Sequence, residues 1–317
     1  MSDSPAPTGA DRFAFPILLL GAAAIAFAPI FVRLSELNPT VTAFERALLS
    51  LPLLWLWMHL ADPAPAKNGK NPDRKSTQPV TRRDYLLLAL PGVFFAGDLG
   101  FWHWSLDYTS VANATLLANF APVFVTALAW ALYGQKPSLR FLLGLCSALG
   151  GAVILMGESF TLSTKHLIGD GLGIITALFY AAYLLSVARL RAKFSTPVIM
   201  AWSTAWTTLC LLPVALINGG DLIATTLYGW LVLLGLAWFS HAGGQSMIAF
   251  AMAHLPPAFG SVSLLLQPTL AALLAWAILD EALSPWQGLG GLLVLAGIML
   301  ARRGSRPEPA PTTAPKP

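Results

Sequence analysis

Long apolar segments alternate with short polar ones along almost the whole chain. A helix that crosses a lipid bilayer needs about 20 mostly apolar residues. Ten segments meet this requirement: residues 14–34, 40–60, 85–106, 110–134, 138–157, 169–189, 196–217, 227–250, 257–279 and 284–301. The pattern therefore predicts an all-α, polytopic membrane protein with ten transmembrane helices.

The composition agrees with this prediction and excludes other classes of protein. Of the 317 residues, 56% are hydrophobic and only 11% are charged, whereas a soluble domain has about 25% charged residues. We therefore exclude a water-soluble enzyme, a disordered protein and a nucleic-acid-binding protein. The two cysteines, Cys146 and Cys210, each lie inside an apolar segment, so no disulfide framework is expected.

The basic residues indicate how the chain is oriented in the membrane. If the N-terminus lies in the cytoplasm, all of the 19 Lys and Arg residues fall in cytoplasmic segments except Arg33, Arg46 and Lys165. Cytoplasmic loops of membrane proteins carry such an excess of positive charge. We therefore expect both termini in the cytoplasm. No cleavage pattern follows the first apolar segment, so we expect this segment to be retained as an anchor.

Two parts of the chain can be aligned with each other. Residues 97–155 match residues 243–301 without a gap, at an offset of 146. Equivalent positions hold identical or similar residues: Pro122 and Pro268, Gln135 and Glu281, Ser138 and Ser284, Gly144 and Gly290, Gly151 and Gly297. Because each half has five spans, the second half must enter the membrane from the opposite side. We therefore expect two inverted five-helix repeats, with a substrate site between them near the midplane and transport by alternating access.

This duplication divides the chain into four parts. They are a cytoplasmic N-terminal segment (residues 1–13), a first repeat (14–157), a second repeat (158–302) and a disordered cytoplasmic tail (303–317). The tail is rich in Pro and Thr, which is typical of segments without a packed core. The polar stretch 61–84 is expected to be a linker.

Several of these features are similar to those of a known family. The repeated proline, residues 105–114 (SLDYTSVANA), residues 278–284 (ILDEALS) and Arg46 early in the second span resemble the EamA family of the drug/metabolite transporter superfamily. The resemblance covers about residues 14–302. It implies a ten-helix carrier that exports small metabolites, often amino acids, across the bacterial inner membrane. The family has Glu where this chain has Gln135, whereas Glu281 is kept, so no role that needs a charge at both positions is expected.

Charged residues at membrane depth are the first candidates for a functional site. An unpaired charge inside a bilayer costs several kcal/mol, and Arg46 and Asp98 lie at comparable depths in adjacent spans. Our hypothesis is an Arg46–Asp98 ion pair at the outer edge of a central cavity. In the alternative interpretation, Arg46 lies at the headgroups and Asp98 bonds a backbone or Trp N–H group.

Two residues follow Asp98 closely and extend this candidate site. Trp102 lies one turn further along, so both residues share a helix face that could bind an amine and an apolar or aromatic side chain. The alternative for Trp102 is the outer aromatic belt of the membrane. His103 could carry a proton because imidazole titrates near physiological pH; alternatively, its ring is simply hydrogen-bonded.

Polar and aromatic residues of later spans complete the predicted cavity. They are Asn119, Tyr180, Tyr183, Trp202, Trp206, His241, Gln245 and Gln267. Spacings of three or four residues place the two tyrosines, the two tryptophans, and the His–Gln pair each on one helix face. For the aromatic residues, packing between helices is an equal alternative. Pro122 and Pro268 are expected to kink their helices, because proline leaves a backbone carbonyl without its usual partner.

These features favour a secondary transporter of small metabolites over the other classes of membrane protein. The Gly-rich stretches lack the residues of a nucleotide-binding loop, and we expect no ATP hydrolysis, metal or cofactor. A membrane-embedded enzyme would require clustered catalytic residues, and a scaffold would need few polar groups at mid-depth. The expected partners are a small-molecule substrate and the lipid bilayer, with no nucleic acid. The substrate, the direction, the coupling ion and the oligomeric state, including a homodimer, are left open.

Overall fold

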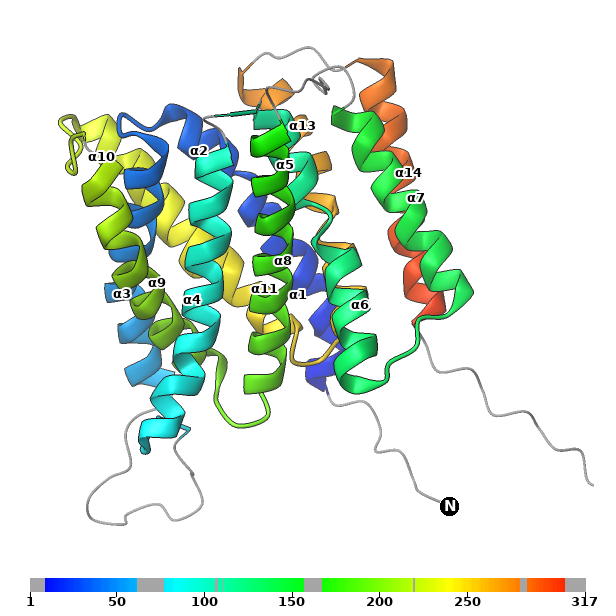
Figure 1. Cartoon of the computed structure of the whole chain (residues 1–317), viewed down its shortest axis with the longest axis horizontal. Helices are drawn as coiled ribbons and strands as arrows, with labels where there is room; N and C mark the ends of the chain where they lie inside the picture. Colours follow the sequence, from blue (N-terminus) through cyan, green and yellow to red (C-terminus); the bar gives the residue numbers. More distant parts are fainter. Residues whose placement is uncertain are drawn as a thin grey trace, which may run out of the picture.

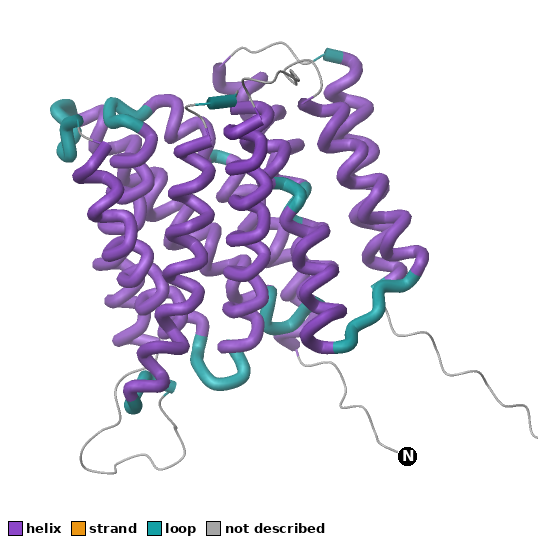
Figure 2. Tube along the Cα trace, viewed as in Figure 1, coloured by secondary structure: helices purple, strands orange, loops and turns teal. Residues whose placement is uncertain are grey.

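The computed structural model describes residues 9–61, 77–105, 108–109, 111–156, 167–218, 220–279 and 284–305. Every regular element within these ranges is a helix, as predicted, and the helices form one bundle (Figures 1 and 2). The first half of the chain contains α1 (Gly9–Ala26), α2 (Ala28–Leu34), α3 (Pro39–Ala61), α4 (Arg82–Ser105), α5 (Val111–Ala118), α6 (Ala121–Tyr133) and α7 (Leu139–Met156). The second half contains α8 (Leu167–Leu190), α9 (Thr196–Asn218), α10 (Leu227–Leu234), the π-helix η3 (Gly235–Gln245), α11 (Ser246–Ala251), α12 (Pro257–Ser263), α13 (Leu266–Leu279) and α14 (Pro285–Gly304).

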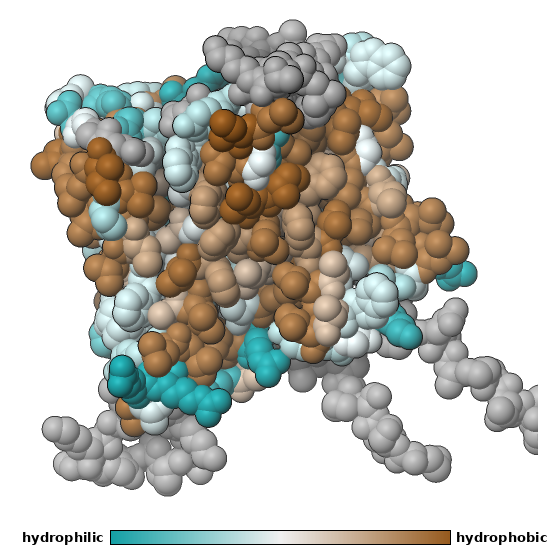
Figure 3. All heavy atoms as spheres, in the orientation of Figure 1, coloured by the Kyte–Doolittle hydropathy of each residue, from teal (hydrophilic) through white to brown (hydrophobic). Residues whose placement is uncertain are grey.

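Most of the predicted spans are long and apolar enough to cross a membrane. In the part of the chain that the structure describes, eight helical segments meet this condition, from Phe13–Leu34 to Pro257–Ile278. The other two predicted spans contain α7 and α14. The apolar stretch of α7, Leu139–Leu155, is shorter than those of the eight segments. Hydrophobic side chains dominate the middle of the visible face, and hydrophilic ones gather towards its two ends (Figure 3). This surface suits a bundle embedded in a bilayer.

Some predicted boundaries differ from those in the structure. The helix α1 begins at Gly9, inside the predicted segment 1–13, and α14 continues to Gly304, so the predicted tail 303–317 begins within a helix. Arg302 and Arg303 stand in the last turn of α14, where positive charge stabilises the carbonyl end of a helix. The remaining tail 306–317, the linker residues 62–76 and residues 280–283, which include Glu281, lie outside the described residues.

Three of the predicted spans are broken by prolines or turns rather than continuous. The span 14–34 is interrupted at Phe27, and Pro29 stands in the first turn of α2. The span 110–134 is interrupted between α5 and α6, and Pro122 occupies the first turn of α6. The span 257–279 is likewise divided into α12 and α13, with Pro268 in the first turn of α13. Proline suits a first turn because its missing N–H would have no helical partner there. Pro122 and Pro268 therefore stand just after the breaks within the apolar spans Ala114–Tyr133 and Pro257–Ile278.

A fourth predicted span, 227–250, changes its helix type. Between α10 and α11, the 11 residues of η3 form a π-helix. Such helices are rare and occur mostly as single turns at functional sites. The equivalent span of the first half, α4, is an α-helix.

Contacts between the two halves occur in matched sets. The helix α4 packs along α8, and the equivalent elements of the other half, η3 and α11, pack along α1. In the same way, α5 and α6 pack against α8, whereas α13 packs against α1. The second spans of the two halves, α3 and α9, contact each other directly. Exchanging the two halves therefore reproduces the pattern of contacts.

The last helices of the halves, α7 and α14, pack together at one side of the bundle, on the right in Figure 1. Gly144 faces Gly297, and Gly151 faces Gly290, so the two helices run antiparallel with their backbones in close approach. An offset of 146 converts the first of these contacts into the second. The Ser147 hydroxyl donates to the carbonyl of Leu293 (3.2 Å). The same offset makes Leu293 the equivalent of Ser147, so this contact joins two equivalent positions. Small residues permit such close helix packing.

Candidate functional site

A cavity of about 200 Å³ lies where the breaks in the helices meet. Its wall includes residues on both sides of the α1–α2 break, Asn119 at the α5–α6 break, Gln245 at the end of η3 and Pro268 in α13. Irregular backbone is tolerated at membrane depth where it is buried in protein or lines a water-filled cavity. The predicted residues that line this central cavity are Arg46, Asp98, Trp102, His103, Asn119, Tyr180, Gln245 and Gln267.

Arg46 and Asp98 bring opposite charges into the central cavity. They project from the neighbouring helices α3 and α4, and Arg46 is 7% exposed. The two groups interact electrostatically. Within the described part of the chain, however, Lys193 and Asp84 are in direct ion-pair contact, whereas Arg46 and Asp98 are not. The predicted Arg46–Asp98 ion pair is therefore not formed at contact distance, although both side chains line the cavity.

His103 and Trp102 lie beside Asp98 on α4. The His103 ring places Nδ1 2.6 Å from the carbonyl oxygen of Leu99, and its Nε2 is buried without a partner. Because a carbonyl only accepts, Nδ1 carries the proton and Nε2 is left as an acceptor in the neutral ring. The Trp102 ring packs edge-on against His103 with a centroid distance of 4.8 Å. One helix turn thus presents a carboxylate, an indole and an imidazole acceptor to the cavity.

A tyrosine–glutamine cluster forms another part of the cavity wall. The Tyr180 and Tyr183 rings stack with centroids 6.0 Å apart, and Tyr183 packs on Phe95 at 4.8 Å. The hydroxyls of both tyrosines lie close to the Gln245 amide, and that of Tyr180 also lies close to Gln267. Tyr180 lines the cavity. Tyr183 does not line it but is buried, at 2% exposed, against the lining residues Tyr180 and Phe95.

Several polar atoms of the cavity wall are buried without a protein partner. They are Nε of Arg46, Nε2 of His103, Nε2 of Gln245 and Nε2 of Gln267. Buried polar atoms are nearly always hydrogen-bonded, to protein, to water or to a ligand. Four such atoms around one cavity therefore offer hydrogen-bonding positions for water or a polar ligand.

Asn119 also has a structural task at the α5–α6 break. Its side-chain nitrogen donates to the carbonyl of Thr115 (2.9 Å), and the Thr126 hydroxyl donates to the carbonyl of Pro122 (2.7 Å). The Thr115 carbonyl also accepts from the backbone N–H of Asn119 (3.1 Å), so the Asn119 side chain adds a second hydrogen bond next to the break. Asn119 thus stabilises the helix next to the break and also lines the cavity.

Two predicted site residues, Trp202 and Trp206, lie away from the cavity. Trp202 packs against Trp55 and Tyr85, with ring centroids 5.1 and 4.9 Å away. Trp206 lies against Gly92 of α4. Both tryptophans fill interfaces between helices, as the packing alternative predicted for the aromatic residues.

His241 is buried behind the cavity instead of lining it. Its Nε2 lies 3.1 Å from the Thr204 hydroxyl of α9, and its ring lies 5.4 Å from Phe95. The side chain is 1% exposed, and Nδ1 has no partner. His241 therefore contacts Phe95, which forms part of the cavity wall.

The cavity also contains residues that the sequence analysis did not select. Phe95, Thr115, Thr176 and Pro29 line it. Thr176 precedes Tyr180 by four residues, and this spacing on one helix face could have identified it. Pro29, like Pro122, is a proline within an apolar span, and this feature could have identified the break between α1 and α2.

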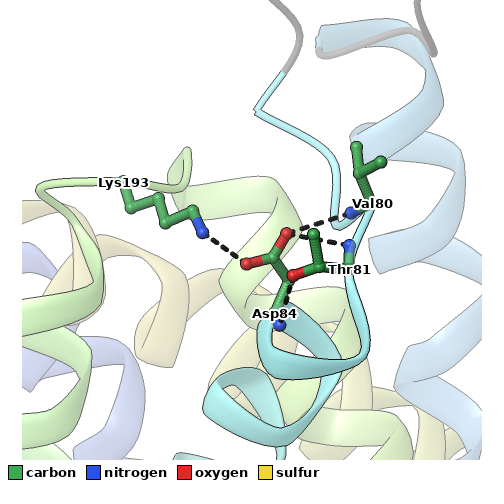
Figure 4. Close-up of polar contacts among 4 residues, drawn as sticks. All are labelled: Val80, Thr81, Asp84 and Lys193. Atoms are coloured by element: carbon green, nitrogen blue, oxygen red, sulfur yellow. Dashed lines mark hydrogen bonds and ion pairs between the residues drawn. The ribbon is translucent and has the colours of Figure 1, made fainter.

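Outside the cavity, polar contacts join the two halves of the chain at each end of the bundle. At one end, the Asp84 carboxylate accepts from the backbone N–H groups of Val80 and Thr81 (3.1 Å each) and pairs with Lys193 of the α8–α9 loop (Figure 4). At the other end, Glu36 accepts from the hydroxyl and N–H groups of Thr225 and Thr226, at the start of α10. Each contact joins a connecting loop of one half to a helix start of the other half.

The Asp84 contact makes a testable prediction about stability. The Lys193 side chain is 55% exposed, and exposed ion pairs contribute about 0–1 kcal/mol. Asp84 also caps the start of α4, and loss of such a cap costs about 1 kcal/mol. We therefore expect Asp84→Ala to lower the free energy of unfolding by about 1–2 kcal/mol and Lys193→Ala by less than about 1 kcal/mol. Thermal denaturation of the purified variants in detergent measures both; a larger loss in Lys193→Ala would contradict this assignment.

In the described residues, no group of three or more His, Cys, Asp and Glu side chains is placed to hold a metal ion.

Comparison with known proteins gives a consistent result along the chain. The EamA-like transporter family matches residues 12–157 and 167–303. An uncharacterized transporter of Archaeoglobus fulgidus is 26% identical over 286 residues, which cover 86% of this chain and 91% of the relative. The threonine/homoserine exporter RhtA of Escherichia coli K12 is 28% identical over 220 residues, covering 68% and 70% of the two chains. A crystal structure superposes with a TM-score of 0.75 at 17% identity, covering 94% of this chain and 98% of the other.

Proposed function

The chain belongs to the EamA-like transporter family, and from this premise we propose that its central cavity carries small zwitterionic metabolites, such as amino acids, out of a bacterial cell. The protein is a multi-pass membrane protein and a transporter of small molecules. The relative RhtA is named as an exporter of threonine and homoserine. These relationships favour transport over catalysis within this chain.

The observation that carries the substrate proposal is the separation of Arg46 from Asp98. Both charges line one cavity, yet they do not pair directly. A zwitterionic amino acid carries a carboxylate and an ammonium group that can bridge such a gap, one to each side chain. Hydrogen bonds to charged groups contribute about 1.5–3 kcal/mol each. A ligand with only one of the two charges would leave the other residue unpaired.

The rest of the cavity suits the side chain of such a substrate. Phe95 and Trp102 supply apolar surface, and the unpartnered amides of Gln245 and Gln267 supply hydrogen-bond donors. Pockets of this kind combine apolar walls with a few polar groups that fix orientation. We infer a small or medium side chain with at least one polar atom.

The transport mechanism that we propose is alternating access by two inverted five-helix repeats, residues 14–157 and 158–302. The matched contacts between the halves support it, as does the exchange of Gly144–Gly297 with Gly151–Gly290. Because α7 and α14 are antiparallel, the axis that relates them is perpendicular to both helices and lies in the membrane plane. Inverted repeats with discontinuous helices at the midplane are typical of secondary transporters.

The orientation that we propose places both termini in the cytoplasm and the protein in the bacterial inner membrane. The basic residues support this orientation: Arg82 and Arg83 lie at the start of α4, Lys193 lies in the α8–α9 loop, and Arg302 and Arg303 lie at the end of α14. Helix ends with these residues gather at one end of the bundle, at the bottom of Figure 1. Positive charge at one face marks the cytoplasmic side.

Counterflow in liposomes tests this function. We expect purified protein to exchange a labelled zwitterionic amino acid for the same unlabelled amino acid, with or without a pH gradient. The N-acetylated and the decarboxylated analogues each lack one charge, and a loss of about 1.4 kcal/mol in binding corresponds to a tenfold weaker affinity. We therefore expect at least about tenfold slower exchange for both analogues at low concentration. Exchange of nucleosides or sugars without any exchange of amino acids would contradict the proposal.

A further inference from the structure

A second cavity opens on the side of the bundle, away from the central cavity. It has a volume of about 860 Å³ and lies between α1, α3, η3, α11 and the α8–α9 loop. We call it the side groove. Its walls are mostly apolar and include Leu53, Leu56 and Leu60 of α3 and Met247 and Phe250 of α11. Leu56 and Leu60 are exposed, so the groove is open to the hydrocarbon that surrounds the bundle.

One end of the side groove carries a positive charge. Arg191 follows the last residue of α8 and lines the groove together with Thr196, the first residue of α9. These residues lie at the junction of two membrane-spanning helices, which is the level of the lipid headgroups. One guanidinium nitrogen donates to the carbonyl of Phe194 (2.6 Å), while Nε is buried without a partner. The described residues that line the groove include no acidic side chain to neutralise this charge.

Two buried hydroxyls in the groove also lack partners. Thr196 is 4% exposed and Ser246 is 7% exposed, and neither side-chain oxygen makes a hydrogen bond within the protein. Leaving such a group unsatisfied costs about 1–3 kcal/mol. Burial also lowers the pKa of the Arg191 guanidinium from its usual value. A cation and two hydroxyls without partners, placed in an apolar groove, indicate a ligand with an anionic head and a hydrocarbon body.

We propose that the side groove binds an anionic phospholipid from the leaflet that the α8–α9 loop faces, with the lipid phosphate at Arg191 and Thr196 and an acyl chain between α3 and α11. The bilayer supplies this ligand at high local concentration. Basic pockets between transmembrane helices are known to bind anionic headgroups. The lipid would contact α1 and α3 of the first half and η3 and α11 of the second half, and so bind across the two halves.

Native mass spectrometry of the purified full chain tests this site. The protein in mild detergent is titrated with dioleoylphosphatidylglycerol, which is anionic, and with dioleoylphosphatidylcholine, which is not. We expect at least tenfold tighter binding of the anionic lipid. Arg191→Gln should abolish this preference. The matched control is Arg189→Gln: Arg189 is exposed at the end of the same helix, with its guanidinium over the Tyr133 ring, and it does not line the groove.

A second variant tests the apolar part of the groove. Leu56→Trp places a larger side chain at an exposed position of the groove wall and should weaken the binding of both lipids at least fivefold. It also keeps the proposal testable if Arg191→Gln does not fold. Unchanged binding of the anionic lipid to either variant would overturn the proposal, as would an equal loss in Arg189→Gln. Displacement of the lipid by millimolar inorganic phosphate would likewise overturn it, because the site would then be one for free phosphate.

Discussion

Replacing Asp98 by Asn should reduce amino-acid counterflow by at least about thirtyfold, the largest functional effect that we expect from any single substitution. Truncating one partner of a buried, hydrogen-bonded charge pair costs about 2–5 kcal/mol, and 1.4 kcal/mol corresponds to a factor of ten. Asp98 lines the central cavity and contributes its carboxylate. Its replacement leaves the substrate ammonium without a counter-charge next to Arg46. Initial rates in liposomes that contain equal amounts of folded protein measure the effect.

The control for this experiment is the variant Asp221→Asn. Asp221 is exposed at the bundle surface, so this variant should transport at the rate of the unmodified protein. The charge exchange Arg46→Asp with Asp98→Arg should recover part of the activity lost in either single variant, because a zwitterion can bind in the reverse direction. Full activity of Asp98→Asn would contradict the assignment of the substrate site.

Replacing Gly151 by Ala should have the largest effect on stability. A Cβ at this position would lie 2.6 Å from the carbonyl oxygen of Gly290 and 2.7 Å from the backbone nitrogen of Val294. These are backbone atoms, so α7 and α14 would have to move apart along their shared interface. Overpacking of a tight core costs about 1–3 kcal/mol, and we expect at least about 2 kcal/mol here. Thermal denaturation in detergent and the yield of monodisperse protein report this loss.

The neighbouring residue provides a matched control for the same helix. A Cβ at Gly150 meets no other atom within 4 Å, and alanine has a helix propensity about 1 kcal/mol better than glycine. Gly150→Ala should therefore leave the melting temperature unchanged or raise it. Equal destabilisation by both substitutions would show that helix conformation, rather than the approach of the two helices, determines the result.

The sequence predicts the helices and their order well, because the length of an apolar segment is set by the bilayer. It also predicts Arg46 and Asp98 as cavity residues, since a charge at membrane depth is costly unless it is paired or faces a water-filled cavity. It does not predict which helix face meets which neighbour. Trp202 and Trp206 share a face, as their spacing indicates, but that face packs into helix interfaces instead of the cavity.

The pair His241 and Gln245 shows a second limit of sequence reasoning. A spacing of four residues puts both side chains on one face of an α-helix. The two residues lie instead in the π-helix η3, in which each hydrogen bond spans five residues, and their side chains have different surroundings. Gln245 lines the cavity, and His241 turns towards Thr204 of α9. No local sequence signal identified this change of helix type.

The π-helix has a consequence for the energetics of the carrier. It occurs in η3, whereas α4, its counterpart by position in the other half, is α-helical. In a carrier with two identical halves, the inward-open and outward-open forms would be related by the two-fold axis between the halves and would have equal free energy. A wider helix in one copy alone removes this degeneracy. Under the alternating-access mechanism that we propose, the unloaded protein should therefore populate its inward-open and outward-open forms unequally, and single-molecule distances across the two faces should show this without any gradient.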